Sequence, residues 1–87
     1  MRIEVHSKTN CPGCVKAKAW LEERNIPYEL HVYDDDEERF AMYARLGLEK
    51  NKGTVPQIVV DGVRLGGYMA LTNSDLEERY KAEVGAE

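Results

Sequence analysis

The feature that most constrains this chain is a pair of cysteines, Cys11 and Cys14, separated by Pro12 and Gly13. They are the only two cysteines among 87 residues, and they lie between a strand-like run and a helix-like run. Thiols at this spacing can close into a disulfide with little backbone movement. A thiol at the beginning of a helix ionises more easily, because unpaired N–H groups and the helix dipole favour negative charge there. Since the thiolate attacks disulfides, the motif predicts thiol–disulfide exchange.

Length and charge limit the other functions open to the chain. Eighty-seven residues make one small domain, predicted here over residues 1–87. The net charge of −4 argues against a general nucleic-acid binder, and no apolar run approaches the roughly 20 residues of a membrane span. The first residues have no secretion-signal pattern, so we expect a cytoplasmic monomer. In a reducing compartment a lone cysteine pair is more often catalytic or metal-binding than structural.

Hydrophobic periodicity predicts alternating strands and helices. In chain order, the expected elements are a strand at 3–8, a helix at 14–24, a strand at 28–33, a helix at 34–46, strands at 57–60 and 63–65, and a helix at 74–84. A β-α-β unit requires a parallel strand pair, and the final hairpin adds two antiparallel strands. The sequence therefore predicts an α/β fold with a four-stranded mixed sheet, in the order β-α-β-α-β-β-α, and helices on both faces.

Several boundaries rest on specific local signals. The acidic run 34–38 suits the N-terminus of a helix, and Gly47 suits the residue after its end. Asp61-Gly62 between two apolar runs is a strong hairpin signal. Ser74 and Glu77 have the spacing of a capping box, which predicts that the last helix begins there.

Four features, in this order and spacing, resemble a glutaredoxin of the thioredoxin fold, and the resemblance covers nearly the whole chain. They are Lys8 three residues before Cys11, the Cys-Pro-x-Cys motif at a helix start, Thr54-Val55-Pro56 before an apolar strand, and Gly66-Gly67 after the last strand. The resemblance implies a single glutaredoxin-like domain. It also implies glutathione as a co-substrate, with no bound cofactor or metal, and disulfide-containing proteins such as ribonucleotide reductase as partners.

The resemblance assigns roles to individual residues. Cys11 would attack a substrate disulfide, and Cys14 would resolve the resulting mixed disulfide. The peptide bond before Pro56 would be cis, and the backbone of Val55 would pair with bound glutathione as an added strand does. Lys8 would favour the thiolate or meet a glutathione carboxylate. The expected glutathione-binding residues are Lys8, Pro12, Gly13, Thr54, Val55, Pro56, Gly66 and Gly67.

Two alternatives remain open at this point. The family often follows its glycine pair with a small residue and Ser-Asp, whereas this chain continues with Tyr68-Met69-Ala70 and lacks the carboxylate. A redoxin reduced by thioredoxin reductase is therefore the first alternative. The second is an iron–sulfur or other metal-binding module. For zinc, only His6 and His31 could complete the ligand set, and we expect them on the surfaces of separate strands without metal-ligand spacing.

Overall fold

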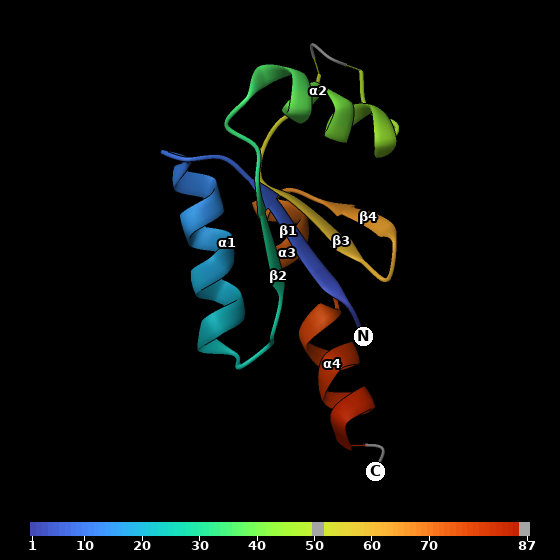
Figure 1. Cartoon of the computed structure of the whole chain (residues 1–87). Helices are drawn as coiled ribbons and strands as arrows, with labels where there is room; N and C mark the ends of the chain where they lie inside the picture. Colours follow the sequence, from blue (N-terminus) through green and yellow to red (C-terminus); the bar gives the residue numbers. More distant parts are fainter. Residues whose placement is uncertain (50–51, 86–87) are drawn as a thin grey trace.

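A computed structural model describes residues 1–49 and 52–85. Its elements are β1 (Ile3–Ser7), α1 (Pro12–Glu23), β2 (Glu29–Val32), α2 (Asp36–Arg45), β3 (Gln57–Val60), β4 (Val63–Gly66), α3 (Tyr68–Thr72) and α4 (Leu76–Gly85) (Figure 1). The strands form one sheet in the order β2-β1-β3-β4. β1 is parallel to β2 and antiparallel to β3, which in turn pairs antiparallel with β4. The predicted four-stranded mixed sheet is confirmed.

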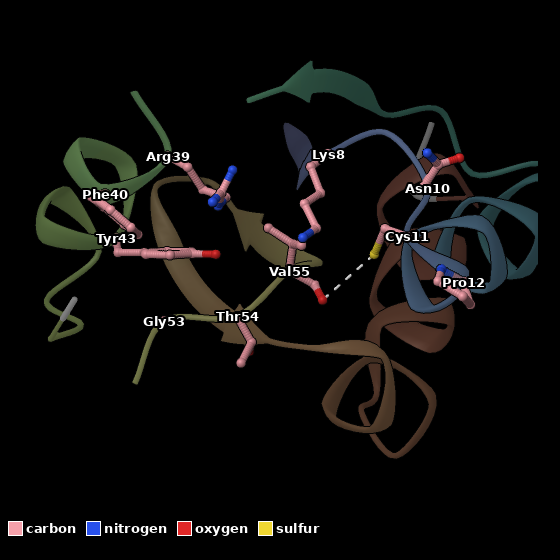
Figure 2. A pocket seen from close by; sticks show the side chains of 10 residues that line it. All are labelled: Lys8, Asn10, Cys11, Pro12, Arg39, Phe40, Tyr43, Gly53, Thr54 and Val55. Carbon is pink, nitrogen blue, oxygen red and sulfur yellow. Dashed lines mark hydrogen bonds between the residues drawn. The ribbon is translucent and has the colours of Figure 1, made fainter. Parts of the chain in front are cut away.

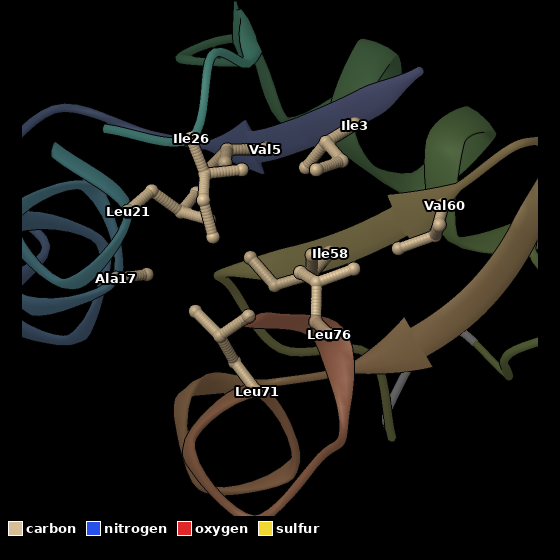
Figure 3. Close-up of a cluster of buried hydrophobic side chains, with 9 residues drawn as sticks. All are labelled: Ile3, Val5, Ala17, Leu21, Ile26, Ile58, Val60, Leu71 and Leu76. Atoms are coloured by element: carbon tan, nitrogen blue, oxygen red, sulfur yellow. The ribbon is translucent and has the colours of Figure 1, made fainter. Parts of the chain in front are cut away.

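The hydrophobic core lies on one face of this sheet, against α1, α3 and the start of α4. Strands β1 and β3 direct alternate side chains to this face, as the period of a strand requires. The buried cluster consists of Ile3, Val5, Ala17, Leu21, Ile26, Ile58, Val60, Leu71 and Leu76 (Figure 3). Each large side chain buried here contributes about 1.5–3 kcal/mol to folding. This packing fixes α1, and with it the cysteine motif, relative to the sheet.

The opposite face of the sheet is also covered, here by α2. Gln57 and Val59 on this face are 4% and 3% exposed, and α2 contributes Met42 and Tyr43 at 1% and 3%. His6 is buried on the same face, at 7% exposure, so the prediction of a strand-surface histidine was wrong. Its ring stacks on His31, with centroids 4.9 Å apart, and its Nδ1 lies 2.9 Å from the Tyr33 hydroxyl. Hydrogen bonding and stacking allow a histidine to replace an apolar residue there.

The two local signals predicted for α2, the acidic start and Gly47, lie at its ends. Asp35 is the N-cap, and its carboxylate accepts a hydrogen bond of 3.1 Å from the backbone N–H of Glu38. Gly47 follows the C-terminal cap with a φ of +79°, a conformation that glycine adopts without cost. None of the helices in the described ranges is long and apolar enough to span a membrane.

Helices α2 and α4 begin at Asp36 and Leu76, each two residues after the predicted start, and two further helices also differ from the prediction. Helix α1 begins at Pro12, two residues before the predicted start, because Cys11 is its N-cap. The five-residue helix α3 was not predicted at all. It is shorter than two turns, so it shows too little periodicity to be seen in the sequence. Its Leu71 is fully buried in the core, and this packing stabilises a segment that propensity alone would leave irregular.

The buried His6 predicts an acid-sensitive stability. Burial lowers the pKa of His6 below its ordinary 6.5. As the pH falls below 6.5, the unfolded chain takes up a proton that the folded chain refuses. The free energy of unfolding should therefore decrease with falling pH until the lower folded pKa is reached. Urea unfolding at several pH values should show this loss in the parent and a smaller one in His6→Gln.

His31→Gln is the matched control, because it removes the partner ring and leaves His6 buried. The free energy of unfolding of His31→Gln should keep most of the pH dependence seen in the parent protein. An equal loss of stability in the parent and in His6→Gln would contradict this role for His6.

Candidate active site

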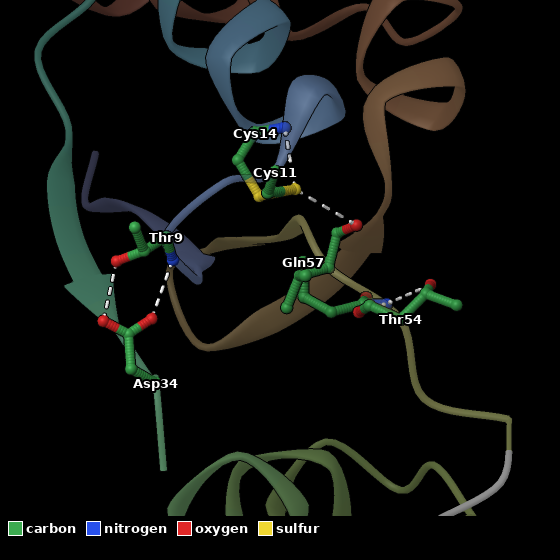
Figure 4. The surroundings of a disulfide bond; sticks show 7 residues. Thr9, Cys11, Cys14, Asp34, Thr54 and Gln57 are labelled. Atoms are coloured by element: carbon green, nitrogen blue, oxygen red, sulfur yellow. Dashed lines mark hydrogen bonds between the residues drawn. A yellow bond between two sulfur atoms is a disulfide. The ribbon is translucent and has the colours of Figure 1, made fainter. Parts of the chain in front are cut away.

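Cys11 and Cys14 form a disulfide at the N-terminus of α1, with their Cα atoms 5.2 Å apart (Figure 4). Cys11 has an extended backbone, and its Sγ accepts a hydrogen bond of 3.2 Å from the N–H of Cys14. Its carbonyl oxygen accepts a second bond, 3.1 Å long, from the N–H of Val15. Cys11 is 8% exposed and Cys14 2%. The helix N-terminus therefore holds the more exposed sulfur where backbone donors stabilise negative charge on it.

The segment before β3 lies directly against this sulfur. The Val55–Pro56 peptide bond is cis, as the resemblance implied. The carbonyl oxygen of Val55 lies 3.7 Å from the Sγ of Cys11, a separation at which the reduced thiol can donate a weak hydrogen bond. A Cβ atom added to Gly13 would lie 3.2 Å from the Pro56 ring. The absence of a side chain at Gly13 thus permits the close approach of the proline loop.

The two glycines at the end of β4, Gly66 and Gly67, have different structural roles. Gly66 has a φ of +130°, and an added Cβ would come within 2.9 Å of the Cβ of Ala70. Gly67 has an ordinary φ of −87°, and an added Cβ would make normal contact, 3.6 Å, with the carbonyl oxygen of Pro56. The fold thus requires glycine at position 66. Position 67 adjoins the proline loop and does not require glycine for backbone reasons.

A pocket of about 480 Å³ opens beside Cys11. It is lined by Lys8, Asn10, Cys11, Pro12, Arg39, Phe40, Tyr43, Gly53, Thr54 and Val55 (Figure 2). Five of these ten residues were predicted from the sequence, whereas the three from α2 were not. We call this site the Lys8–Arg39 pocket. Two of its lining side chains are cationic and none is acidic, so it is suited to a ligand that carries a carboxylate.

Arg39 is the main residue that the sequence analysis missed. Its Nη1 donates a hydrogen bond of 3.2 Å to the carbonyl oxygen of Tyr33, and its Nη2 donates one of 2.6 Å to Asp36. The bond with Asp36 raises the pKa of Arg39 further, so the guanidinium stays charged. No linear motif contains this arginine. Arg39 could be predicted as a site residue only by first predicting that its helix lies opposite the cysteine loop.

A pair of hydrogen bonds fixes the loop that carries Lys8 and Cys11. The backbone N–H and the hydroxyl of Thr9 each donate a bond of 2.7 Å to the carboxylate of Asp34 (Figure 4). These bonds lower the pKa of Asp34, which therefore stays ionised in mild acid. The loop after β1 is thereby tied to the segment that leads into α2. Both sides of the Lys8–Arg39 pocket are held by this contact.

The carboxylate that the family often places after the glycine pair has no equivalent here. Ser74 lies two residues before the start of α4, and its hydroxyl accepts a bond of 3.2 Å from the N–H of Leu76. Asp75 lies 4.0 Å from Arg79, one turn further along α4. Ala70 stands at the position of that carboxylate, and Met69 beside it, at the position of the serine, is 68% exposed. Within residues 1–49 and 52–85, no group of three or more His, Cys, Asp or Glu side chains is arranged to hold a metal ion.

A cysteine pair at a helix N-terminus, beside a cis-proline loop on a four-stranded mixed sheet, defines a thiol–disulfide oxidoreductase of the thioredoxin fold. The family model for glutaredoxin matches residues 3–65. This chain therefore belongs to the glutaredoxin family, whose enzymes are thiol–disulfide oxidoreductases.

Individual relatives agree with this assignment. Glutaredoxin 1 of Rickettsia felis is 35% identical over 81 residues, which cover 88% of this chain and 74% of that protein. The crystal structure of glutaredoxin 1 from Francisella tularensis, complexed with cacodylate, matches with a TM-score of 0.76 at 29% identity, over 92% of this chain and 96% of that one. A buckwheat glutaredoxin–glutathione complex shares the fold, with a TM-score of 0.65 at 22% identity, over 95% of this chain and 69% of that one.

The glycine pair yields a test of these separate roles. Gly66→Ala places a side chain in left-handed backbone space and should cost about 1–3 kcal/mol of stability. Gly67→Ala should leave the free energy of unfolding nearly unchanged, because its conformation and its contacts are ordinary. Urea unfolding of the two variants makes the comparison. Equal destabilisation by both substitutions would show that Gly67 is also structurally required.

Proposed function

We propose that this chain is a glutathione-dependent oxidoreductase that reduces protein disulfides and glutathione mixed disulfides. The observation that carries the proposal is the position of the Lys8–Arg39 pocket, which shares Cys11 with the disulfide and offers two cations. Glutathione is an anionic tripeptide thiol, so its sulfur could reach Cys11 while a carboxylate meets these cations. The whole chain would act as one catalytic domain, as a monomer in the cytoplasm.

In the proposed reaction, the two cysteines act in sequence. The Cys11 thiolate attacks one sulfur of the substrate disulfide, and the other substrate sulfur leaves and takes a proton. Cys14 then attacks the Sγ of Cys11, which releases the reduced substrate and closes the Cys11–Cys14 disulfide. One glutathione opens this disulfide to give a glutathione adduct on Cys11. A second glutathione removes the adduct as glutathione disulfide and restores the dithiol.

Glutathione recognition would combine backbone pairing with charge. Val55 lies two residues before Gln57, the first residue of β3, and its carbonyl lies next to Cys11. Its backbone would pair with the cysteinyl backbone of glutathione, as a short added strand does. Thr54 lines the same pocket, and Gly67 allows close approach beside the proline loop. Disulfide-containing enzymes such as ribonucleotide reductase are the electron acceptors that family membership suggests.

A specific observation also favours a second candidate function. After the glycine pair, this chain has Met69 and Ala70 where the family often has serine and the aspartate that completes the glutathione site. A protein that lacks this carboxylate could instead receive electrons from thioredoxin reductase, through the same cysteine pair. Both candidate functions keep the redox chemistry of Cys11 and Cys14 and differ in the source of electrons.

The two functions are separated by supplying the oxidised protein with two reducing systems, each with NADPH. One contains glutathione and glutathione reductase, and the other contains thioredoxin reductase. We expect fast NADPH oxidation with glutathione and slow oxidation with thioredoxin reductase, because the two cations of the Lys8–Arg39 pocket would bind a small anion. Turnover only with thioredoxin reductase would overturn the glutathione proposal.

Cysteine variants are the controls for this experiment. Cys11→Ser should support turnover with neither reducing system. Cys14→Ser should still reduce a glutathione mixed disulfide, because a second glutathione can release the adduct from Cys11. If Cys11→Ser kept most of the activity and Cys14→Ser lost it, the roles of the two cysteines would be reversed.

The contribution of Arg39 is testable by kinetics. Arg39→Gln should raise the KM for glutathione about tenfold, the effect of losing about 1.4 kcal/mol of binding. The kcat should change much less, because the residue lies on the pocket wall and not at the reacting sulfurs. Raised salt concentration should increase the KM of the parent protein more than that of the variant.

Arg79→Gln is the matched control, because Arg79 is an exposed arginine on α4 paired with Asp75. It should leave the KM for glutathione and its salt dependence unchanged. Unaltered kinetics in Arg39→Gln would exclude Arg39 from the glutathione site.

A further inference from the structure

A second hollow, of about 350 Å³, lies on the other side of the disulfide. It shares Lys8, Asn10 and Cys11 with the Lys8–Arg39 pocket, and it is bounded further out by α1 and β2. We call it the side hollow. The disulfide therefore stands between two depressions, only one of which the proposed glutathione site uses.

The outer rim of the side hollow is apolar and exposed. Val15 on α1 is 60% exposed, and Val32 on β2 is 50% exposed. Leu30, two residues before Val32 on the same face of the strand, is 45% exposed. β2 is an edge strand that runs beside α1, so this apolar seam continues away from the disulfide (Figure 1). Grouped exposed apolar side chains next to a reactive centre are typical of interaction surfaces.

The charge around the side hollow is positive. Lys8 and Lys18 line it, and none of its lining residues is acidic. Asp34 is bonded to Thr9 of this lining, and both of its carboxylate oxygens accept hydrogen bonds from that residue. The chain as a whole carries a net charge of −4. At physiological salt, charges interact over only about 8 Å. The two lysines of the side hollow, and not the net charge of the chain, therefore favour a negatively charged ligand there.

We propose that the side hollow receives the segment of a protein substrate that flanks its reactive cysteine, and that this segment carries an apolar side chain next to an aspartate or glutamate. The proposal rests on the proposed function and names its protein-substrate class. Glutathione has no apolar side chain that would use Val15 and Val32. A protein segment can cover them while its sulfur reaches Cys11, and its carboxylate can approach Lys18.

The test compares peptides that each carry one cysteine as a mixed disulfide with glutathione. One peptide has Leu and Glu beside the cysteine, a second has Leu and Lys, and 2-hydroxyethyl disulfide is the small substrate. The kcat/KM of the parent protein should favour the Leu-Glu peptide by about threefold to tenfold, the range for two exposed charge contacts. Lys18→Glu should remove or reverse this preference. It should leave turnover of the small disulfide unchanged.

Val32→Thr tests the apolar rim while keeping a β-branched residue in the strand. It should lower kcat/KM for both peptides and not for the small disulfide. The matched controls are Lys81→Glu on α4, where the lysine is 70% exposed, and Val63→Thr on β4, where the valine is 70% exposed. Neither control should alter the preference between peptides. Thermal unfolding checks that all four variants fold.

Three results would overturn the docking proposal. The first is an unchanged peptide preference in Lys18→Glu. The second is an equal effect of Lys81→Glu. The third is a self-associated parent protein, seen by sedimentation, that Lys18→Glu or Val32→Thr makes monomeric, because the occupant would then be a second copy. A parent protein that turns over no disulfide with glutathione, the small one included, would instead contradict the proposed function, and the docking proposal with it.

Discussion

The hydrogen bond from the N–H of Cys14 to the Sγ of Cys11 is the interaction on which the site depends. The N-cap of a helix is usually a Ser, Thr, Asp or Asn, whose side-chain oxygen accepts such a bond. In this protein a sulfur does so, and the same atom is one half of the disulfide. The same hydrogen bond therefore fixes both the first residue of α1 and the position of the reactive sulfur. Ala17 and Leu21 of α1 are buried in the core. The packing of the core therefore fixes the position of Cys11 and Cys14 relative to the sheet.

Strand pairing brings the remaining parts of the site to this sulfur. His6 pairs with Gln57 in the antiparallel β1–β3 ladder, so the chain leaving β1 meets the chain entering β3. The cysteine loop and the cis-proline loop consequently face each other although 44 residues separate Cys11 from Val55. The hydrogen bonds between Thr9 and Asp34 add the third segment, because they tie the cysteine loop to the chain that enters α2. Each part of the pocket is thus attached to the sheet within a few residues.

Much of the fold and part of the site could be predicted from local sequence signals, because those signals act between residues close together in the chain. The cysteine motif, the acidic start of α2 and the Asp61-Gly62 turn each depend on neighbouring residues, and the structure has the elements that they predict. Arg39 and the buried His6 could not be found in this way. The position of Arg39 in the pocket depends on how α2 packs over the sheet. The burial of His6 depends on the same packing and on partners in another strand.

The place of β2 at the edge of the sheet bears on how the protein behaves at high concentration. An edge strand offers free backbone groups to any other strand, which makes it a site for aggregation. β2 has only four residues, and on one of its faces Glu29 forms an ion pair with Arg2. A second copy pairing with so short a strand would gain few hydrogen bonds. The unpaired edge of β2 can therefore remain exposed without making the protein prone to form fibres at high concentration.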